Sequence, residues 1–291
     1  MLSTKEIKQR IRSISSIKQI TRAMEMVAAS RLKKVESRVV ASRTYTEKMH
    51  SVLSHLVSSL ENAHPWFSEK GLENPTIKVI LITADKGLCG AYNNNIIQKV
   101  VRFIREKTDK KIKLILIGKK GYLYFSKSKY ADLIEKYIPE GTEKLGYNQI
   151  QEIASRLIKE YEGNEFGELH IFFTRFVSMM QSSPTTMRFL PIEKGAFASQ
   201  EKPQGEYIFE PSAEQIINHL FPKFVETRLY QCILESLTSE YAARRVAMIA
   251  ATENAGEMIE ELTRSYNKAR QESITKELLE IVSGADALTR K

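Results

Sequence analysis

The sequence predicts an α/β domain inserted between two long terminal helices, which pair with each other as an antiparallel coiled coil. Three observations predict this fold class. Residues 1–63 contain neither glycine nor proline. Residues 75–210 alternate short apolar runs with amphipathic runs, and no proline follows Pro222. Long proline-free segments with apolar residues every three or four positions are typical of coiled coils, and alternating strands and helices are typical of an α/β layer.

Residues 3–60 are predicted to form the first long helix, about 85 Å in length at ~1.5 Å per residue. Ser3 and Glu6 have the spacing of a capping box, which satisfies free N–H groups of the first turn. Pro65 is expected to end the helical run. Apolar residues at steps of three or four predict the seam of this helix: Ile7, Ile11, Ile14, Ile17, Ile20, Met24 and Val27.

Residues 75–210 are predicted to form a Rossmann-like α/β domain with a mostly parallel sheet. The β-branched and aromatic residues of several short runs favour buried strands. In chain order the strand and helix runs are IKVILIT, IIQKVVRFIREK, KIKLILIG, KKGYLYFSKS, NQIQEIASRLIKEY, ELHIFFTRFV and TTMRFLPI. Residues 194–206 are polar and contain glycine and proline, so they are predicted to form a loop.

Residues 212–288 are predicted to form the second long helix. Ser212 and Gln215 have the spacing of another capping box. Pro222 is expected to kink the helix or to restart it, because proline removes one helical hydrogen bond. The predicted seam consists of Leu229, Ile233, Leu237, Val246, Ile249, Ile259, Leu262, Tyr266, Leu278 and Ile281.

One stretch of the second helix is rich in small residues. Gly256 follows six alanines: Ala242, Ala243, Ala247, Ala250, Ala251 and Ala255. Small residues let two helix backbones approach closely, so this stretch is expected to pair with three alanines of the first helix, Ala23, Ala28 and Ala29.

The predicted domains are therefore a first shaft helix over residues 1–62, the α/β domain over 75–210 and a second shaft helix over 211–288. Neither helix can bury its seam alone, which favours an antiparallel pair. The expected product is a rod with a globular domain at one end. A rod longer than its globular domain needs a partner, because much of its surface otherwise has no role.

The charge of the chain is concentrated at one end. Residues 1–60 hold 12 Lys and Arg against 4 Asp and Glu, and so carry +8 of the net charge of +9. A basic segment of this kind faces nucleic acid, lipid headgroups or an acidic protein surface, or is a solvated helix face. Two cysteines give no disulfide framework and indicate a reducing compartment. No signal segment or apolar membrane span is expected.

The stretch ITADKGLCGAYNNN, residues 82–95, resembles a phosphate loop in outline only. A Walker loop needs G-x-x-x-x-G-K-[ST], but Lys86 precedes both glycines, and no hydroxyl follows to hold magnesium. The dinucleotide form needs three glycines, G-x-G-x-x-G, and only Gly87 and Gly90 are present. We predict a strand-to-helix turn in which Asp85 and the asparagines at 93–95 satisfy backbone groups.

No catalytic, cofactor or metal site is predicted. The motifs G-x-S-x-G and H-E-x-x-H are absent, and two isolated cysteines and five scattered histidines have no zinc-ligand spacing. His50 and His55 are five residues apart and do not share a helix face. Two alternatives stay open at this point: a basic coiled-coil protein that binds nucleic acid, and a nucleotide-binding enzyme built on the central sheet.

The sequence resembles the gamma subunit of the rotary proton-translocating ATP synthase, over nearly its whole length. The segments that carry the resemblance are KQITRAMEMVAASR (18–31), SEYAARRVAMIAATEN (239–254) and YNKARQESITKELLEIVSGA (266–285). The glycine turn also matches the family form, with Ala84 where serine is usual.

The resemblance implies a central rotor stalk inside a ring of alpha and beta subunits, which hold the nucleotide sites. The α/β domain would contact the epsilon subunit and the membrane rotor ring of c subunits. Neither nucleic acid nor a cofactor is implied as a partner. Because no transit peptide is recognised, we expect a bacterial protein at the cytoplasmic face of the plasma membrane, held there through the ring.

The resemblance also implies which residues contact partners. Met24 would lie near the lever of a catalytic subunit, and the basic first helix would face an acidic loop there. The apolar tip around Ile281 and Val282 would turn within a hydrophobic collar, so it is expected to be exposed in the isolated chain. Tyr207 would face the rotor ring and epsilon. The implied contacts with the catalytic head are Met24, Asp85, Lys86, Cys89, Arg244, Arg270, Gln271, Thr275 and Glu277.

Overall fold

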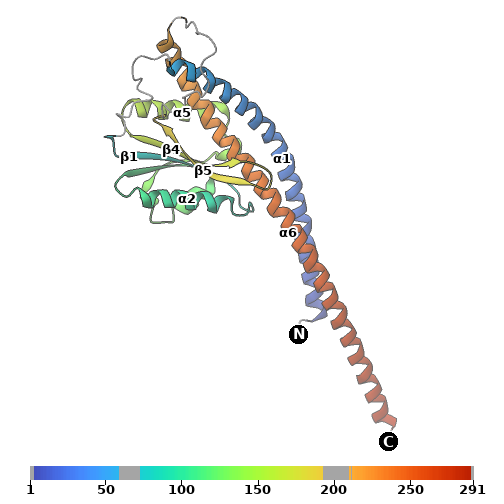
Figure 1. Ribbon diagram of the computed structural model, residues 1–291. Coiled ribbons are helices and arrows are strands. Elements are labelled where there is room, and N and C mark those ends of the chain that lie inside the picture. Colours follow the sequence, from blue (N-terminus) through green and yellow to red (C-terminus); the bar gives the residue numbers. More distant parts are fainter. Residues whose placement is uncertain (1–2, 59–72, 193–209, 211, 290–291) are drawn as a thin grey trace. The chain divides into compact units, whose positions relative to one another are not determined.

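The computed structural model describes residues 3–58, 73–192, 210 and 212–289, with the side chains of residue 58 and of residues 286–289 left out (Figure 1). Both predicted long helices are present: α1 spans Thr4–Ser58 and α6 spans Ala213–Thr289. The first capping box is confirmed, because the Ser3 N–H donates to Glu6 Oε2 (2.8 Å) and the Glu6 N–H donates to Ser3 Oγ (3.3 Å). The predicted loop at 194–206 and the break at Pro65 lie outside the described residues.

Helix α6 continues through Pro222, so the alternative of a restart is wrong. Proline costs a helix interior about 3 kcal/mol. The neighbouring Phe221, Phe224 and Val225 are almost completely buried, and this packing outweighs one lost hydrogen bond. At the start of α6 the Gln215 N–H donates to Ser212 Oγ at 3.3 Å, which is one half of the predicted capping box.

The α/β domain contains one five-stranded sheet in the order β3-β2-β1-β4-β5. All neighbouring strands are parallel except β4 and β5, which are antiparallel. This confirms the predicted mostly parallel, Rossmann-like arrangement. The strands are β1 Thr76–Ile82, β2 Lys111–Ile117, β3 Ile134–Ile138, β4 Glu168–Phe176 and β5 Ser182–Leu190; the helices between them are α2 Tyr92–Glu106, α3 Lys119–Phe125, α4 Gly141–Lys144 and α5 Tyr147–Glu162, with a short 3-10 turn at Ala131–Leu133.

Helices cover both faces of the sheet, with α5 on one face and α2 on the other (Figure 1). Alternate residues of β1 point to opposite faces, as the two-residue period of a strand requires. Ile80 and Ile82 join the core beneath α5, whereas Val79 and Leu81 join the core beneath α2. The α5 core also takes in side chains from α1 and α6, which anchors both long helices to the domain.

The sequence pattern missed β3 and α4. Strand β3 has the sequence IEKYI at the edge of the sheet, and only Ile138 among its residues is buried. An edge strand with charged side chains lacks the apolar run that identifies a central strand. Helix α4 has only four residues, too few for a periodic pattern to be visible.

By its internal contacts the chain divides into two compact units, residues 1–28 with 245–291 and residues 29–244. The first unit is an antiparallel pair formed by the start of α1 and the end of α6. Thr252 Oγ1 donates to Thr21 Oγ1 at 2.8 Å, and a Cβ added at Gly256 would lie 3.0 Å from Lys18 Nζ. Higher numbers on α6 therefore face lower numbers on α1, which confirms the predicted antiparallel pairing.

The seam of α1 differs from the predicted one. Steps of four and three lead from Ile7 through Ile11 and Ile14 to Lys18, Thr21 and Ala28, and this face is the more buried one. Ile17, Ile20 and Val27 are instead 52%, 59% and 54% exposed. The prediction merged two faces because the true seam becomes polar at Lys18. The apolar residues one position earlier lie about 100° away around the helix.

The partner predicted for the small-residue stretch is also partly wrong. The close neighbour of Gly256 is the long side chain of Lys18 and not an alanine, and Ala23 is exposed. Ala28 and Ala255 are buried, as expected for residues at a close helix pair.

Candidate functional site

The glycine stretch forms the turn between β1 and α2, as predicted. Ala84 donates its N–H to Asn93 Oδ1 at 2.9 Å, and the Lys119 N–H donates to Asp85 Oδ1 at 3.0 Å. Asn94 and Asn95 are exposed, so of the three asparagines Asn93 has the predicted role. These bonds fix the path of the chain as it leaves the sheet.

Two further glycines, missed by sequence reasoning, close this edge of the sheet. Gly118 has φ +95°, and an added Cβ would overlap with the carbonyl oxygen of Thr83. Gly141 has φ +68°, and an added Cβ would overlap with the carboxylate of Asp85. Thr83 Oγ1 accepts the Gly121 N–H at 2.9 Å. The loops after β1, β2 and β3 are therefore in direct contact, with no room for a larger residue at either glycine.

Helix α6 occupies the place where open α/β sheets bind ligands, outside the carboxyl ends of the strands where the chain reverses direction across the sheet. In this sheet that place lies at β1 and β4. Ser236 Oγ accepts the Thr174 N–H at 3.0 Å, and Ser239 Oγ donates to the Thr174 carbonyl at 3.0 Å. Glu235 Oε2 accepts the Phe176 N–H at 2.9 Å. Side chains of α6 thus form hydrogen bonds with the backbone N–H and carbonyl groups at the end of β4.

Arg244 fastens the glycine turn to α6. Its Nη2 donates to the carbonyl oxygens of Lys86 (3.4 Å) and Gly87 (3.3 Å), and its Nη1 lies 2.7 Å from Glu240 Oε1. Cys89 is only 2% exposed, and its Sγ accepts a hydrogen bond from Asn93 Nδ2 at 3.2 Å. Burial raises the pKa of the Cys89 thiol, which therefore stays protonated at neutral pH.

These positions give the predicted contact residues unequal access to a partner. Arg244 and Cys89 are buried in their own chain, whereas Lys86 is exposed and Asp85 is half-buried. The structure brings all four together at one edge of the sheet. Contact of these residues with a catalytic head remains a prediction.

Glu240 is a buried carboxylate whose side chain is 7% exposed. Burial raises its pKa to about 6, and Arg244 opposes this rise. A carboxyl group whose pKa is raised in the folded state binds its proton more tightly there than in the unfolded chain. Its contribution to stability is therefore fully present below the unfolded pKa of 4.5 and is lost as the pH rises through about 6.

We expect Glu240→Gln to flatten the pH dependence of stability between pH 5 and pH 7. A pKa shift of Glu240 from 4.5 to about 6 changes the free energy of unfolding by at most about 2 kcal/mol between pH 5 and pH 7. Amide hydrogen exchange at β1 and β4, measured at several pH values on the purified chain and its variant, checks this. Glu253→Gln changes an exposed glutamate of α6 and serves as the control. Equal pH slopes in all three proteins would contradict the role of Glu240.

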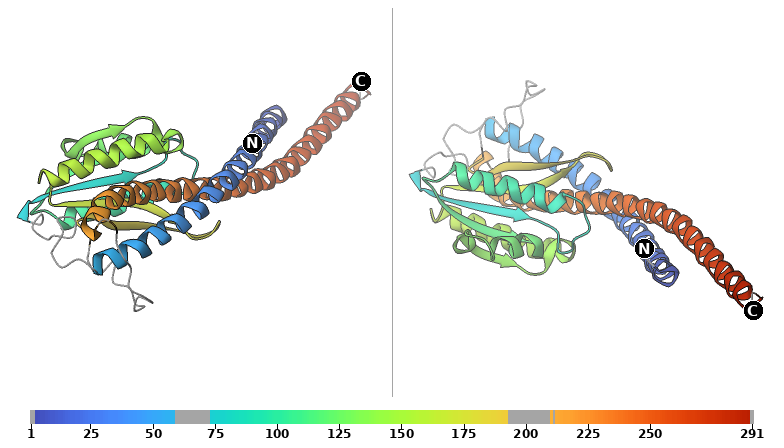
Figure 2. Two further views of the ribbon diagram at one scale, coloured as in Figure 1. Left: turned by 90° about the horizontal axis from the view of Figure 1, so that it is seen from above. Right: turned by 90° about the horizontal axis from the view of Figure 1, so that it is seen from below.

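The predicted contacts at the end of α6 are all exposed: Arg270, Gln271, Thr275 and Glu277. The register explains why. Thr21 lies opposite Thr252 in the antiparallel pair. Thr4, the first residue of α1, therefore lies opposite Ala269, which is as far beyond Thr252 as Thr4 is before Thr21. Beyond Ala269, α6 has no residue of α1 opposite it. Figure 2 shows this part of α6, in red, continuing past the N-terminal end of α1.

The extended end of α6 carries apolar side chains that no described residue covers. Residues 271–285 are all exposed. The large apolar side chains among them are Ile274, Leu278, Leu279, Ile281 and Val282, which are between 48% and 68% exposed. The predicted exposure of the tip is thus confirmed for the isolated chain. Tyr207 lies outside the described residues.

A second exposed apolar face lies on α1 and was missed as a separate surface. Ile17, Ile20 and Val27 share it with Met24, which is half-buried, because the four residues follow each other at steps of three, four and three. The signal was present in the sequence as a second set of apolar positions beside the seam.

The part of the chain that the structure describes contains neither a membrane-spanning helix nor a metal site. Within the described residues, no helix is long and apolar enough to cross a membrane. The same residues contain no group of three or more His, Cys, Asp or Glu side chains placed to hold a metal ion.

The fold and this edge of the sheet define a class of protein: a long helical pair that carries an α/β domain whose usual ligand position is occupied by one of its own helices. A family model described as ATP synthase matches residues 3–288. The chain is 41% identical to the ATP synthase gamma chain of Desulfitobacterium hafniense over 99% of its length and all of that protein, and 40% identical to those of Desulforamulus reducens and Heliobacterium modesticaldum.

The chain therefore belongs to the family of ATP synthase gamma chains, the non-catalytic subunits of the central stalk. Solved structures share its fold. A chain of the Euglena gracilis mitochondrial ATP synthase aligns with a TM-score of 0.71 at 19% identity, over 98% of this chain and 94% of that one. A chain of the Tetrahymena thermophila central stalk and c-ring aligns with a TM-score of 0.58 at 23% identity, over 80% and 99%.

Proposed function

We propose that the chain transmits rotation from a proton-driven ring in the membrane to the catalytic head of ATP synthase, and so couples proton transport to ATP synthesis or hydrolysis. The alpha and beta subunits of the head hold the nucleotides and surround the paired helices. The observation that carries this proposal is the apolar end of α6, where residues 271–285 are exposed and α1 has no residue opposite the helix. A contiguous exposed apolar surface of this kind marks a site of interaction with a partner.

The surface of the helix pair differs from one side to another, which a rotor requires. One side of α1 is apolar at Ile17, Ile20 and Val27. Exposed basic side chains extend along the same segment: Lys5, Lys8, Arg10, Arg12 and Arg22. These would face an acidic surface of a catalytic subunit. A rotor that makes different contacts at different angles shifts each catalytic site between its states, whereas equal contacts would shift nothing.

Whereas the helix pair would contact the catalytic head, the α/β domain would contact the epsilon subunit and the c-ring. The chain would then lie at the cytoplasmic face of the bacterial plasma membrane, attached through the ring alone. Lys86 and Asp85, at the accessible side of the glycine turn, would contact the lower edge of the head. Membership of the gamma-chain family argues against the nucleic-acid-binding alternative, which rested only on charge.

We expect Met24→Lys to uncouple proton pumping from ATP hydrolysis while the complex still assembles. Met24 is half-buried beside the exposed Ile20, so a lysine there places a charge on the face proposed to meet the catalytic subunits. A contact worth about 1.4 kcal/mol at one rotor angle changes the occupancy of that angle about tenfold. The measurement is the ratio of ATP-driven proton uptake to ATP hydrolysis in inverted membrane vesicles.

The matched control is Val52→Lys, which adds the same charge on α1 beside the α/β domain, at a residue that is 50% exposed. It should leave the ratio unchanged. A wild-type ratio in the Met24→Lys complex would count against the proposed contact face.

A further inference from the structure

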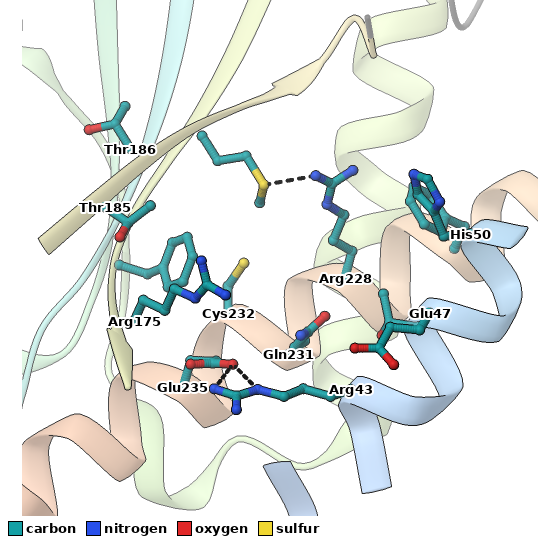
Figure 3. Close-up of a pocket in the computed structure, with 14 residues that line it drawn as sticks. Arg43, Glu47, His50, Arg175, Thr185, Thr186, Arg228, Gln231, Cys232 and Glu235 are labelled. Carbon is teal, nitrogen blue, oxygen red and sulfur yellow. Dashed lines mark hydrogen bonds and ion pairs between the residues drawn. The ribbon is translucent and has the colours of Figure 1, made fainter. Parts of the chain in front are cut away.

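A cavity of about 520 Å³ lies within the unit of residues 29–244 and is separate from the glycine turn (Figure 3). Its walls come from three parts of the fold. Helix α1 contributes Arg43, Glu47 and His50. Strands β4 and β5 contribute Arg175, Thr185, Thr186 and Met187, and α6 contributes Phe224, Arg228, Gln231, Cys232 and Glu235. This volume lies within the range of small-molecule sites. No role of the chain derived above uses the cavity.

The charges that line the cavity do not balance. Of its three arginines, Arg43 is neutralised by Glu235, with 2.7 Å between Nη2 and Oε1. Arg175 and Arg228 remain, and Figure 3 shows them on opposite walls. Among the described residues of the lining, the only other carboxylate is Glu47, which is exposed. Burial raises the pKa of the lining thiol of Cys232 to about 12, so this group stays neutral.

Arg228 is the unusual group. Its Nη2 lies 3.1 Å from Met187 Sδ, a weak acceptor, and its guanidinium lies 5.4 Å from the centre of the Phe224 ring. No carboxylate pairs with it among the described residues. A guanidinium has five N–H donors, and a partly buried one without an anion is costly. Burial lowers the pKa of Arg228 for this reason.

We propose that this cavity binds a small organic anion, whose phosphate or carboxylate oxygens accept hydrogen bonds from Arg228 and Arg175. Bidentate recognition of such oxygens is the characteristic use of arginine. The hydroxyls of Thr185 and Thr186 add polar contacts, and the rings of Phe173 and Phe224 offer an apolar wall for the rest of the ligand. A bound anion would connect α1, the sheet and α6 at once.

The test is titration calorimetry on the full chain with four probes: inorganic pyrophosphate, citrate, phenyl phosphate and a hexaglutamate peptide. Pyrophosphate and citrate separate phosphate from carboxylate ligands, and phenyl phosphate tests the aromatic wall. We expect at least one small anion to bind and to raise the melting temperature as its concentration increases. Arg228→Gln and Arg175→Gln should each weaken that binding about tenfold or more.

Arg102→Gln removes the same charge from an exposed position on α2 and should leave binding unchanged. If Arg228→Gln does not fold, Arg175→Gln still decides, because Arg175 is exposed and its replacement leaves no buried gap. Three results would overturn the proposal: no binding of any small anion to the folded chain, equal binding in all variants, or binding of the peptide alone.

Discussion

Replacement of Gly118 by alanine should lower the free energy of unfolding of the α/β domain by about 3–5 kcal/mol, the sum of backbone strain and overpacking. Gly118 has φ +95°, a conformation that residues with a Cβ rarely adopt, and the new methyl group would overlap with the carbonyl of Thr83. That carbonyl belongs to the backbone of the neighbouring loop and cannot move without disturbing the end of β1. The measurement is native-state amide exchange of β1 and β2, which reports the opening free energy of the domain itself.

Gly90→Ala is the matched control for this change. Gly90 also has a positive φ, +55°, but nothing lies within 4 Å of an added Cβ. The free energy of unfolding should then fall by only about 1 kcal/mol, the cost of the strained backbone conformation. If Gly118→Ala and Gly90→Ala lower the free energy of unfolding by the same amount, the overlap with Thr83 does not contribute to the effect. The close packing of the loops would then not be what stabilises this edge of the sheet.

Arg244→Ala should destabilise the same domain by about 3–5 kcal/mol, because it leaves a buried carboxylate without its partner. The side chains of Arg244 and Glu240 are only 10% and 7% exposed, and the guanidinium also holds the carbonyls of Lys86 and Gly87. Arg244 keeps the pKa of Glu240 lower than burial alone would set it. The loss should therefore be smaller at pH 5, where Glu240 carries a proton, and larger at pH 7.

The control is Arg264→Ala on the same helix. Arg264 pairs with Glu260 at the same spacing of four residues, but these side chains are 82% and 75% exposed. An exposed ion pair contributes little, so this variant should unfold almost like the wild type. Amide exchange of β1 and α2 distinguishes the two variants, and equal protection at both pH values would refute the anchoring role of Arg244.

The sequence was sufficient to predict the fold because its long-range pattern was strong. Two proline-poor segments with three- and four-residue steps predicted α1 and α6, and short runs rich in β-branched, aromatic and other apolar residues predicted four of the five strands. The edge strand β3 was missed because Glu135 and Lys136 lie in the middle of its five residues and interrupt any apolar run. The seam of α1 was misplaced because a buried Thr21 and a half-buried Lys18 do not look like seam residues.

The site was harder to predict because its key contacts join residues far apart in the chain. Spacing alone correctly indicated that ITADKGLCGAYNNN was no phosphate loop and that Asp85 and Asn93 would support a turn. It could not indicate that Arg244 reaches Lys86, or that Ser236 and Glu235 satisfy the end of β4. These bonds depend on where α6 crosses the sheet, which no local pattern encodes.

Direct observation of rotation tests the central claim, that this chain is the rotor of the complex. Both native cysteines are buried, so a cysteine introduced at the exposed Lys127 of the α/β domain can be labelled selectively with a bead. The alpha and beta head is fixed to a surface and ATP is added. We expect the bead to turn in one direction for as long as ATP is present. ATP hydrolysis at the normal rate with a stationary bead on an intact, correctly labelled complex would contradict the account.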